Sequence, residues 1–155
     1  MREGNPMPEK NGIFISYSHK DKQWLDRLKA SLQPLVFGEI ITVWDDRSIP
    51  AGSNWLDEIN KAVASARIAV LLVSIDFLAS GFIHRKELPD LLKRRDEGMG
   101  FFWVPIEKTL YKFTPLKDVQ SAWDSDKPLS GLSDAELASA LTDIATKLAE
   151  WKPQQ

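Results

Sequence analysis

Hydrophobic and polar residues alternate along the chain between two kinds of pattern. Short apolar runs rich in β-branched and aromatic residues predict strands, and longer segments with apolar residues three or four apart predict helices between them. This alternation of strands and helices predicts an α/β fold with an open, mainly parallel sheet of four or five strands and helices on both faces. The predicted strands span residues 12–18, 39–46, 67–74 and 100–106, and the predicted helices span residues 21–35, 54–66, 80–95 and 133–151.

Two of these segments carry additional local signals. Residues 67–74 are continuously hydrophobic, which is typical of a parallel strand that is covered on both faces. In the last helix, Ser133 and Glu136 have the spacing of a capping box, and the apolar residues after them form a full stripe. Residues 107–131 show no clear period, so we expect loops there, with a short helix near residues 116–122.

A glutamate stands in the apolar row of the third predicted helix. If that helix were continuous, Ile83, Glu87 and Leu91 would lie on one of its faces. A carboxylate at the edge of an apolar stripe is commonly a surface residue that reaches water, and the local pattern alone favours that interpretation. Pro89 is disfavoured inside a helix, so we expect a kink or a new helix start near Leu88, with Glu87 at the junction.

The length and composition suit a single globular domain. The chain has 155 residues, of which 43% are hydrophobic and 27% are charged, as in ordinary soluble folds. We expect a flexible N-terminal segment at residues 1–11, the folded domain at residues 12–151, and a tail or the start of a linker at residues 152–155.

The charge and the residue types exclude several classes of function. A formal net charge of −2 gives no reason to expect a nucleic acid or an anionic membrane as a partner. The absence of cysteine and the presence of only two histidines, His19 and His84, argue against a metal site. The longest apolar run, residues 68–75, is far shorter than the roughly 20 residues that cross a bilayer. Because no signal-peptide pattern precedes it either, we expect a cytoplasmic protein.

The carboxyl ends of the predicted strands are where this kind of fold places its sites. No glycine-rich dinucleotide motif, phosphate-binding loop or nucleophile elbow occurs in the chain. Asp45 and Asp46 follow a strand, and phosphate-receiving response regulators also carry acidic residues after strands. Their acidic pair follows the first strand, however, and here that strand ends in Ser-Tyr-Ser, which disfavours that class. The strand ends fall at residues 16–18, 44–46, 74–76 and 106–107.

Three segments in order resemble the TIR (Toll/interleukin-1 receptor) domain family, especially its bacterial members. FISYS, residues 14–18, is similar to the first conserved box, and WDDRSIPAGSNW, residues 44–55, is similar to the loop after the second strand. The resemblance extends from about residue 12 to residue 151 and implies a flavodoxin-like TIR fold. A third segment resembles the one that carries the catalytic glutamate of the family, and its matching residues are Ser74, Phe77, Ser80, Phe82, Glu87 and Leu88.

The resemblance implies two alternative functions. Many bacterial and plant TIR domains cleave NAD+ between nicotinamide and ribose, whereas many animal TIR domains are adaptors that bind only other TIR domains. Adaptors often lack the carboxylate found here at Glu87, so the resemblance favours an NAD+ nucleosidase that releases nicotinamide and ADP-ribose or a cyclic isomer. Bacterial members act in antiphage defence. The alternative is an interaction module, including a virulence factor that mimics host Toll-like receptor adaptors.

The resemblance also implies roles for individual residues. Glu87 would be the catalytic residue, because a carboxylate stabilises the positive charge that develops on the ribose as nicotinamide leaves. A loop that mediates assembly would contain Asp46, Ile49, Pro50 and Gly52. The substrate-binding residues would be Tyr17, Ser18, Trp44, Asp45, Arg47, Trp55, Ser80 and Phe82.

Several of these residues have a simpler interpretation that the sequence leaves open. Trp44 and Trp55 are also suited to core packing, Arg47 to a solvated loop, and Ser18 and Ser80 to helix capping. Many relatives have Trp where this chain has Phe82, so the shape of the pocket is expected to differ.

The implied partners are NAD+ as substrate and other TIR domains. No cofactor is expected. Family behaviour implies that a neighbouring copy completes the site, so activation would accompany assembly into an oligomer or filament. A sensor domain after the C-terminal tail is a further expected partner. The sequence leaves open the product isomer, the trigger, the resting oligomeric state and the choice between defence and virulence.

Overall fold

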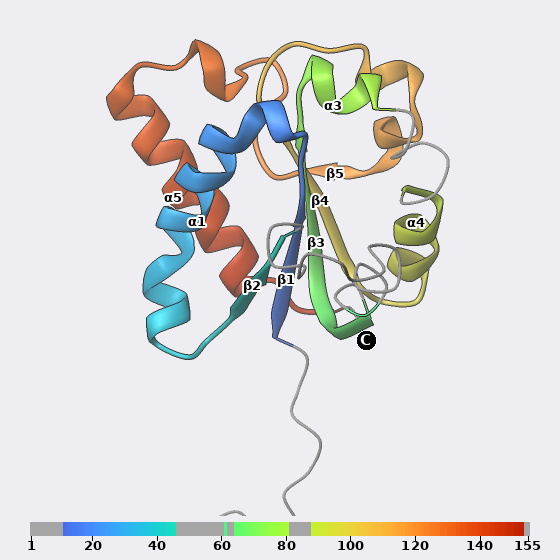
Figure 1. The fold of residues 1–155 in the computed structure, drawn as a ribbon, viewed down its shortest axis with the longest axis vertical. Helices are drawn as coiled ribbons and strands as arrows, with labels where there is room; N and C mark the ends of the chain where they lie inside the picture. The colour runs from blue at the N-terminus through green and yellow to red at the C-terminus, as the bar shows by residue number, and fades with distance from the viewer. Residues whose placement is uncertain (1–10, 46–60, 62–63, 81–87, 154–155) are drawn as a thin grey trace, which may run out of the picture.

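The centre of the fold is one parallel sheet (Figure 1). The computed structural model describes residues 11–45, 61, 64–80 and 88–153. The strand order is β2-β1-β3-β4-β5, and every neighbouring pair is parallel, which confirms the expected open parallel α/β sheet. The strands are β1 (Gly12–Ser16), β2 (Thr42–Trp44), β3 (Ala66–Val73), β4 (Gly100–Pro105) and β5 (Gln120–Ser121).

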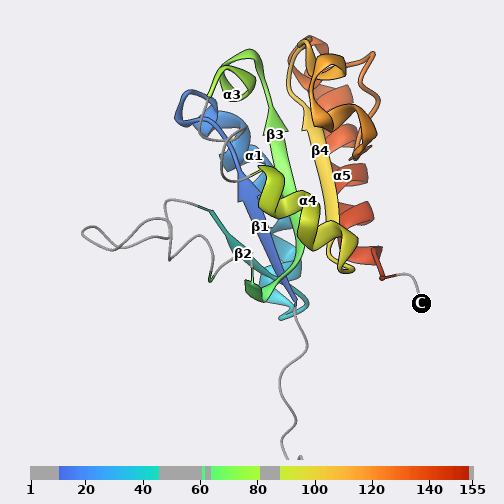
Figure 2. The same ribbon diagram turned by 90° about the vertical axis from the view of Figure 1, so that its right-hand side faces the viewer.

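Helices cover both faces of the sheet, as expected (Figure 2). Helices α1 (Lys22–Phe37) and α5 (Asp134–Glu150) pack side by side on one face, and α4 (Leu88–Asp96) lies on the other. The short helix α3 (Ile75–Ala79) lies beyond the carboxyl end of β3. Short 3-10 helices lie between these elements: η1 (His19–Asp21), η4 (Tyr111–Phe113), η5 (Pro115–Asp118) and η6 (Leu129–Gly131).

Strand β3 separates two hydrophobic cores, and its side chains alternate between them. Ile68, Val70 and Leu72 face α1 and α5, whereas Ala69 and Leu71 face α4. All of these side chains are buried, which confirms that this strand is covered on both faces.

The predicted helices that the structure describes are confirmed in α1, α4 and α5, with a difference around α3. In α5 the Ser133 hydroxyl accepts from the amide of Glu136, and the Glu136 carboxylate accepts from the amide of Ser133, which completes the capping box. Of the third predicted helix, residues 80–95, the structure describes Ser80, which lies outside any helix, and α4 from Leu88. Pro89 therefore occupies the first turn of a new helix, where its missing N–H needs no partner. Helix α3, which ends at Ala79, lies before that range and was not predicted.

The chain after α5 is held against the amino end of the sheet by Trp151. The Trp151 carbonyl accepts a hydrogen bond from Arg67 Nη2 at 2.5 Å, and the guanidinium carbon of Arg67 lies 5.6 Å from the centroid of the indole ring. The indole also lies on Gly100, where a β-carbon would come within 2.8 Å of the ring. Any side chain at the start of β4 would therefore displace the indole.

Candidate functional site

The carboxyl edge of the sheet contains a topological switch point between β1 and β3. After β1 the chain turns to β2 on one side, and β3 then lies on the other side of β1. In open α/β sheets, ligands bind beyond the strand ends at such a point. Two connections meet here: residues 17–21 after β1, and Ser74 followed by α3 after β3 (Figure 2).

The connection after β1 contains the predicted substrate residues Tyr17 and Ser18. The Tyr17 side chain is only 8% exposed and belongs to the core under α1 and α5, with its ring 5.8 Å from that of His19. Ser18 is half-buried, and its hydroxyl accepts a hydrogen bond from the Lys20 amide at 3.3 Å, which caps η1. His19 is exposed. At this connection, Ser18 and His19 are therefore more accessible to a ligand than Tyr17.

The end of β2 contains the predicted substrate residues Trp44 and Asp45. Trp44 is half-buried and packs against the core under α4, the arrangement expected from its simpler interpretation. The Asp45 carboxylate is completely buried, and its Oδ2 lies 2.8 Å from Lys29 Nζ of α1. In this structure Asp45 anchors the end of β2 to α1.

Two polar residues that sequence reasoning did not assign join the connections at the switch point. Asp21 is 7% exposed and Ser74 is fully buried, and the Ser74 hydroxyl donates a hydrogen bond to Asp21 Oδ2. Burial raises the pKa of the Asp21 carboxyl; the hydrogen bond from Ser74 opposes this, and the charges of Asp76 and Glu107 add to it. Ser74 lies at one of the strand ends already singled out, whereas Asp21 carries no signal except its place after the first strand.

The segment that connects α3 to α4 contains the predicted catalytic residue. Ser80 is half-buried at the end of α3, and its amide donates to the Phe77 carbonyl at 3.1 Å, so it is the C-terminal cap of that helix. Leu88, directly after Glu87, is buried at the start of α4. The remaining predicted site residues lie outside the described residues: Asp46, Arg47, Ile49, Pro50, Gly52, Trp55, Phe82 and Glu87.

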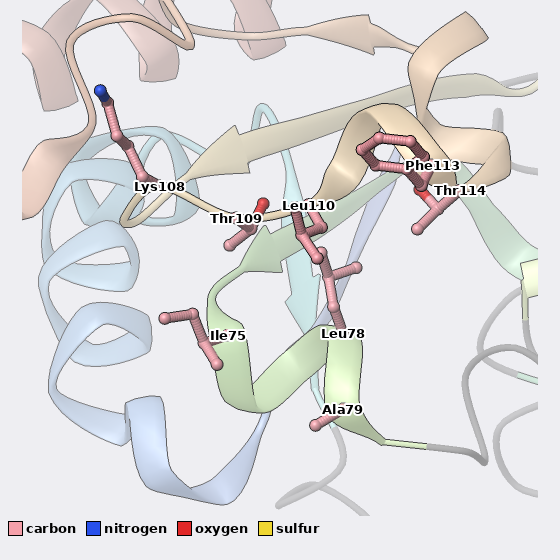
Figure 3. Close-up of a pocket in the computed structure, with 8 residues that line it drawn as sticks. All are labelled: Ile75, Leu78, Ala79, Lys108, Thr109, Leu110, Phe113 and Thr114. Carbon is pink, nitrogen blue, oxygen red and sulfur yellow. The ribbon is translucent and has the colours of Figure 1, made fainter.

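An apolar groove lies between α3 and the chain that follows β4 (Figure 3). Its volume is about 620 Å³, and Ile75, Leu110 and Phe113 are 60%, 72% and 86% exposed around it. The hydroxyl of Thr109, in the same wall, is buried without a hydrogen-bond partner. The groove and the switch point both involve α3, since Ile75 and Leu78 line the groove and Ser74 begins the helix.

Two further features are absent from the described part of the chain. Among those residues, no three His, Cys, Asp or Glu side chains are grouped so that they could hold a metal ion. None of the helices described there is both long and apolar enough to cross a bilayer.

Comparison with known proteins agrees with the fold. A family model described as TIR domain matches residues 13–127, more than half of the chain. A relative, the uncharacterized protein y4lF of Sinorhizobium fredii, is 35% identical over 94 residues, which cover 61% of this chain and 29% of the relative. The chain therefore spans less than a third of that relative's length.

Two solved structures are similar to the chain at low sequence identity. The TIR domains of the activated Roq1 resistosome, which recognizes the pathogen effector XopQ, align with a TM-score of 0.50 and 18% identity over 88% of this chain and 84% of theirs. The TIR domain of the Toll-related receptor TRR-2 of Hydra magnipapillata aligns with a TM-score of 0.49 and 15% identity, over 74% and 86%. The parallel sheet, its covering helices and the family match lead to one conclusion: the chain belongs to the TIR domain family.

Proposed function

We propose that this TIR domain cleaves NAD+ at the bond between nicotinamide and ribose. The observation that carries the proposal is the meeting of two connections at the switch point, one after β1 and one after β3. From the second connection the chain continues through α3 and Ser80 to Glu87, which immediately precedes α4. Family membership and the glutamate at this position of the sequence support the same reaction.

The reaction breaks the C1′–N bond of NAD+, and the bonding electron pair leaves with neutral nicotinamide. The ribose ring acquires positive charge, and a water molecule then forms a C1′–O bond and loses a proton, which gives ADP-ribose. A hydroxyl or ring nitrogen of the same molecule in place of water would give a cyclic isomer. Because nicotinamide leaves as a stable neutral molecule, the reaction needs stabilisation of the cation more than it needs a strong acid.

Glu87 is the residue that we assign to this stabilisation. A carboxylate close to the ribose would offset the developing charge and accept hydrogen bonds from the ribose hydroxyls. Two of the predicted substrate residues that the structure describes are partly exposed serines. Ser18 lies in the connection after β1, and Ser80 follows α3 in the connection after β3. We assign contact with the substrate to these two serines, because Tyr17 and Asp45 are buried.

Nicotinamide release tests the proposal directly. Purified wild type should release nicotinamide from NAD+, and Glu87→Gln, which keeps the size of the side chain and removes its charge, should lose at least about 100-fold in rate, a magnitude typical for an electrostatic catalytic group. Glu97→Gln is the matched control, because Glu97 is an exposed glutamate beyond the other end of α4. Equal release by wild type and Glu87→Gln would contradict the assignment.

A second candidate function is a non-enzymatic module that binds other TIR domains. The exposed apolar side chains around the groove, Ile75, Leu110 and Phe113, favour it, since contiguous apolar surface commonly marks a protein interaction site. If the protein is an adaptor, Glu87→Gln should still bind a second copy of the chain, and the wild-type protein should release no nicotinamide. The two functions are thus separated by the same pair of proteins.

We place the proposed enzyme in the cytoplasm and in bacterial antiphage defence, with residues 12–151 as the catalytic domain. The similarity to a much longer relative supports the expectation that other domains accompany this one. Activation by self-assembly belongs to the same proposal.

A further inference from the structure

The exposed apolar side chains in the described part of the chain gather at the groove beside α3. Five large hydrophobic side chains there are more than half exposed, and three of them border the groove: Ile75, Leu110 and Phe113. The other two, Phe37 and Ile40, lie together at the end of α1 and just after it. Apolar surface that is contiguous around a groove marks a docking site for another molecule, whereas scattered exposed residues do not.

The α3 wall of the groove is held in place by contacts with two other parts of the chain. The hydroxyl of Ser74, the N-terminal cap of α3, donates to the Asp21 carboxylate of η1. The Glu107 carboxylate, after β4, accepts a hydrogen bond from the amide of Ile75 at 2.8 Å. These contacts fix the first turn of α3 from two sides. A preformed wall lowers the cost of docking, because it need not be ordered on binding.

The two walls of the groove carry charges of opposite sign at the same end (Figure 3). Ile75 of α3 and Lys108 of the other wall lie at one end, and Phe113 lies at the other. The side chain of Asp76, next to Ile75, is 44% exposed, and its contact with Lys20 at 3.6 Å is weak at this exposure. The ammonium group of Lys108 points away from α3, so it does not neutralise Asp76 of its own copy. Each wall therefore presents a charge that another molecule can pair.

These features suit a second copy of the chain as the occupant. A twofold axis along the groove would set α3 of one copy against residues 108–114 of the other, with the same ends of the two grooves together. Asp76 of each copy would then face Lys108 of the other, and Phe113 would face the small side chain of Ala79. Because the acidic and the basic wall belong to one surface, that surface is complementary to itself.

We propose that a second copy of the chain docks in this groove, with α3 of each copy against residues 108–114 of the other, and that this contact is the self-association that activates cleavage. The activation rests on the proposed function, whereas the docking does not. The surface shares no residue with the predicted assembly loop at residues 46–52. It lies beside the switch point, because Asp76 also contacts Lys20 of η1, and Ser18, which we assign to the substrate, caps η1.

Sedimentation velocity over a concentration series of the purified chain tests the docking. Wild type should self-associate, and Phe113→Ser should weaken that association about 10-fold or more, as the loss of an aromatic anchor commonly does. Phe37→Ser is the matched control, because Phe37 is 79% exposed and lies at the end of α1, outside the groove. This control should leave the association constant within about twofold of wild type.

An exchange of charges tests that the occupant is a second copy and that opposite walls meet. Asp76→Lys places a lysine on both walls, and Lys108→Asp places an aspartate on both. Each variant alone should therefore associate about 10-fold more weakly than wild type, because like charges would face each other. An equimolar mixture of the two variants should recover the association, since each lysine then faces an aspartate. Recovery in the mixture would also show that both variants are folded.

Three results would each overturn the docking: a wild type that stays monomeric, equal association of wild type and Phe113→Ser, or no recovery in a mixture of charge variants that unfold like wild type. Nicotinamide release separates these results from the proposed function. Release by a monomer would overturn the docking and leave the cleavage standing, whereas self-association without release would keep the docking and overturn the cleavage. Where both occur, Phe113→Ser should lose rate as it loses association, and an unchanged rate would overturn activation through this contact.

Discussion

Lys29 Nζ of α1 lies 2.8 Å from Oδ2 of Asp45, a carboxylate that is completely buried at the end of β2. The Lys29 side chain is 34% exposed, so its ammonium group can remain in contact with water while it neutralises the fully buried carboxylate of Asp45. The pair fixes the point from which the chain leaves the sheet toward residues 46–60. The pair therefore stabilises the fold at the residue that directly precedes the predicted assembly loop.

Removal of the lysine charge should destabilise the protein. Lys29→Met keeps most of the apolar stem and removes a charge-assisted hydrogen bond from a buried carboxylate, so we expect a loss of about 1–3 kcal/mol in the free energy of unfolding. Urea denaturation measures the loss. Arg94→Met is the comparison, since Arg94 pairs with Asp90 at 3.0 Å on the half-exposed surface of α4, and about 0.5 kcal/mol or less is expected there. Equal losses in the free energy of unfolding for the two variants would show that burial of Asp45 does not strengthen its contact with Lys29.

The raised pKa of Asp21 predicts a pH dependence of stability with a definite sign. The folded state binds this proton more tightly than the unfolded state, whose pKa is near the ordinary value of 3.8, so stability falls as pH rises through the folded pKa. Asp21→Asn removes this dependence. Relative to wild type, the variant should become progressively more stable as the pH rises from about 4 through the folded pKa of Asp21.

Urea denaturation of both proteins across this pH range checks the sign. Ser74→Ala removes the hydrogen bond that lowers the pKa of Asp21, and it should extend the decline of stability to higher pH. A stability difference between wild type and Asp21→Asn that stays constant with pH would show that Asp21 is not buried as described.

The contacts of Asp21 and of Asp45 show what the sequence could and could not predict. Strands β1 to β4 and helices α1 and α5 follow from hydrophobic period and capping signals, and the helix start near Leu88 follows from Pro89, all of which are local. Strand β5 and helix α3 were not predicted, because two and five residues carry too little pattern. The partners Ser74 and Asp21 are 53 residues apart, and Lys29 and Asp45 are 16 apart, so neither pair has a local signature. The strand ends were predicted as the site, but which side chains are buried there depends on packing between helices and sheet.

The contact between Gly100 and Trp151 predicts a strong effect of one methyl group. Gly100→Ala would place its β-carbon 2.8 Å from the indole, so the ring must move away from the start of β4. We expect a loss of about 1–3 kcal/mol in the free energy of unfolding, the usual range for overpacking. Gly131→Ala has open space around the new methyl group and should change stability by about 0.5 kcal/mol or less.

Thermal or urea unfolding of the two alanine variants measures this difference. In the background of Trp151→Ala the methyl group meets no ring, so Gly100→Ala should then cost much less than it does in wild type. Additive effects of the two substitutions would show that the indole does not lie on Gly100.

Activation by self-assembly predicts that nicotinamide release per molecule rises with protein concentration. If a neighbouring copy completes the site, a competent state becomes populated only when copies associate, so the rate should increase more steeply than the first power of concentration. A mixing experiment makes the prediction sharper. A low, fixed concentration of wild type should be stimulated several-fold by an excess of Glu87→Gln, which contributes the neighbouring surface without its own catalysis. An equal mass of serum albumin controls for crowding. A rate per wild-type molecule that is independent of added Glu87→Gln would show that a single copy holds the complete site.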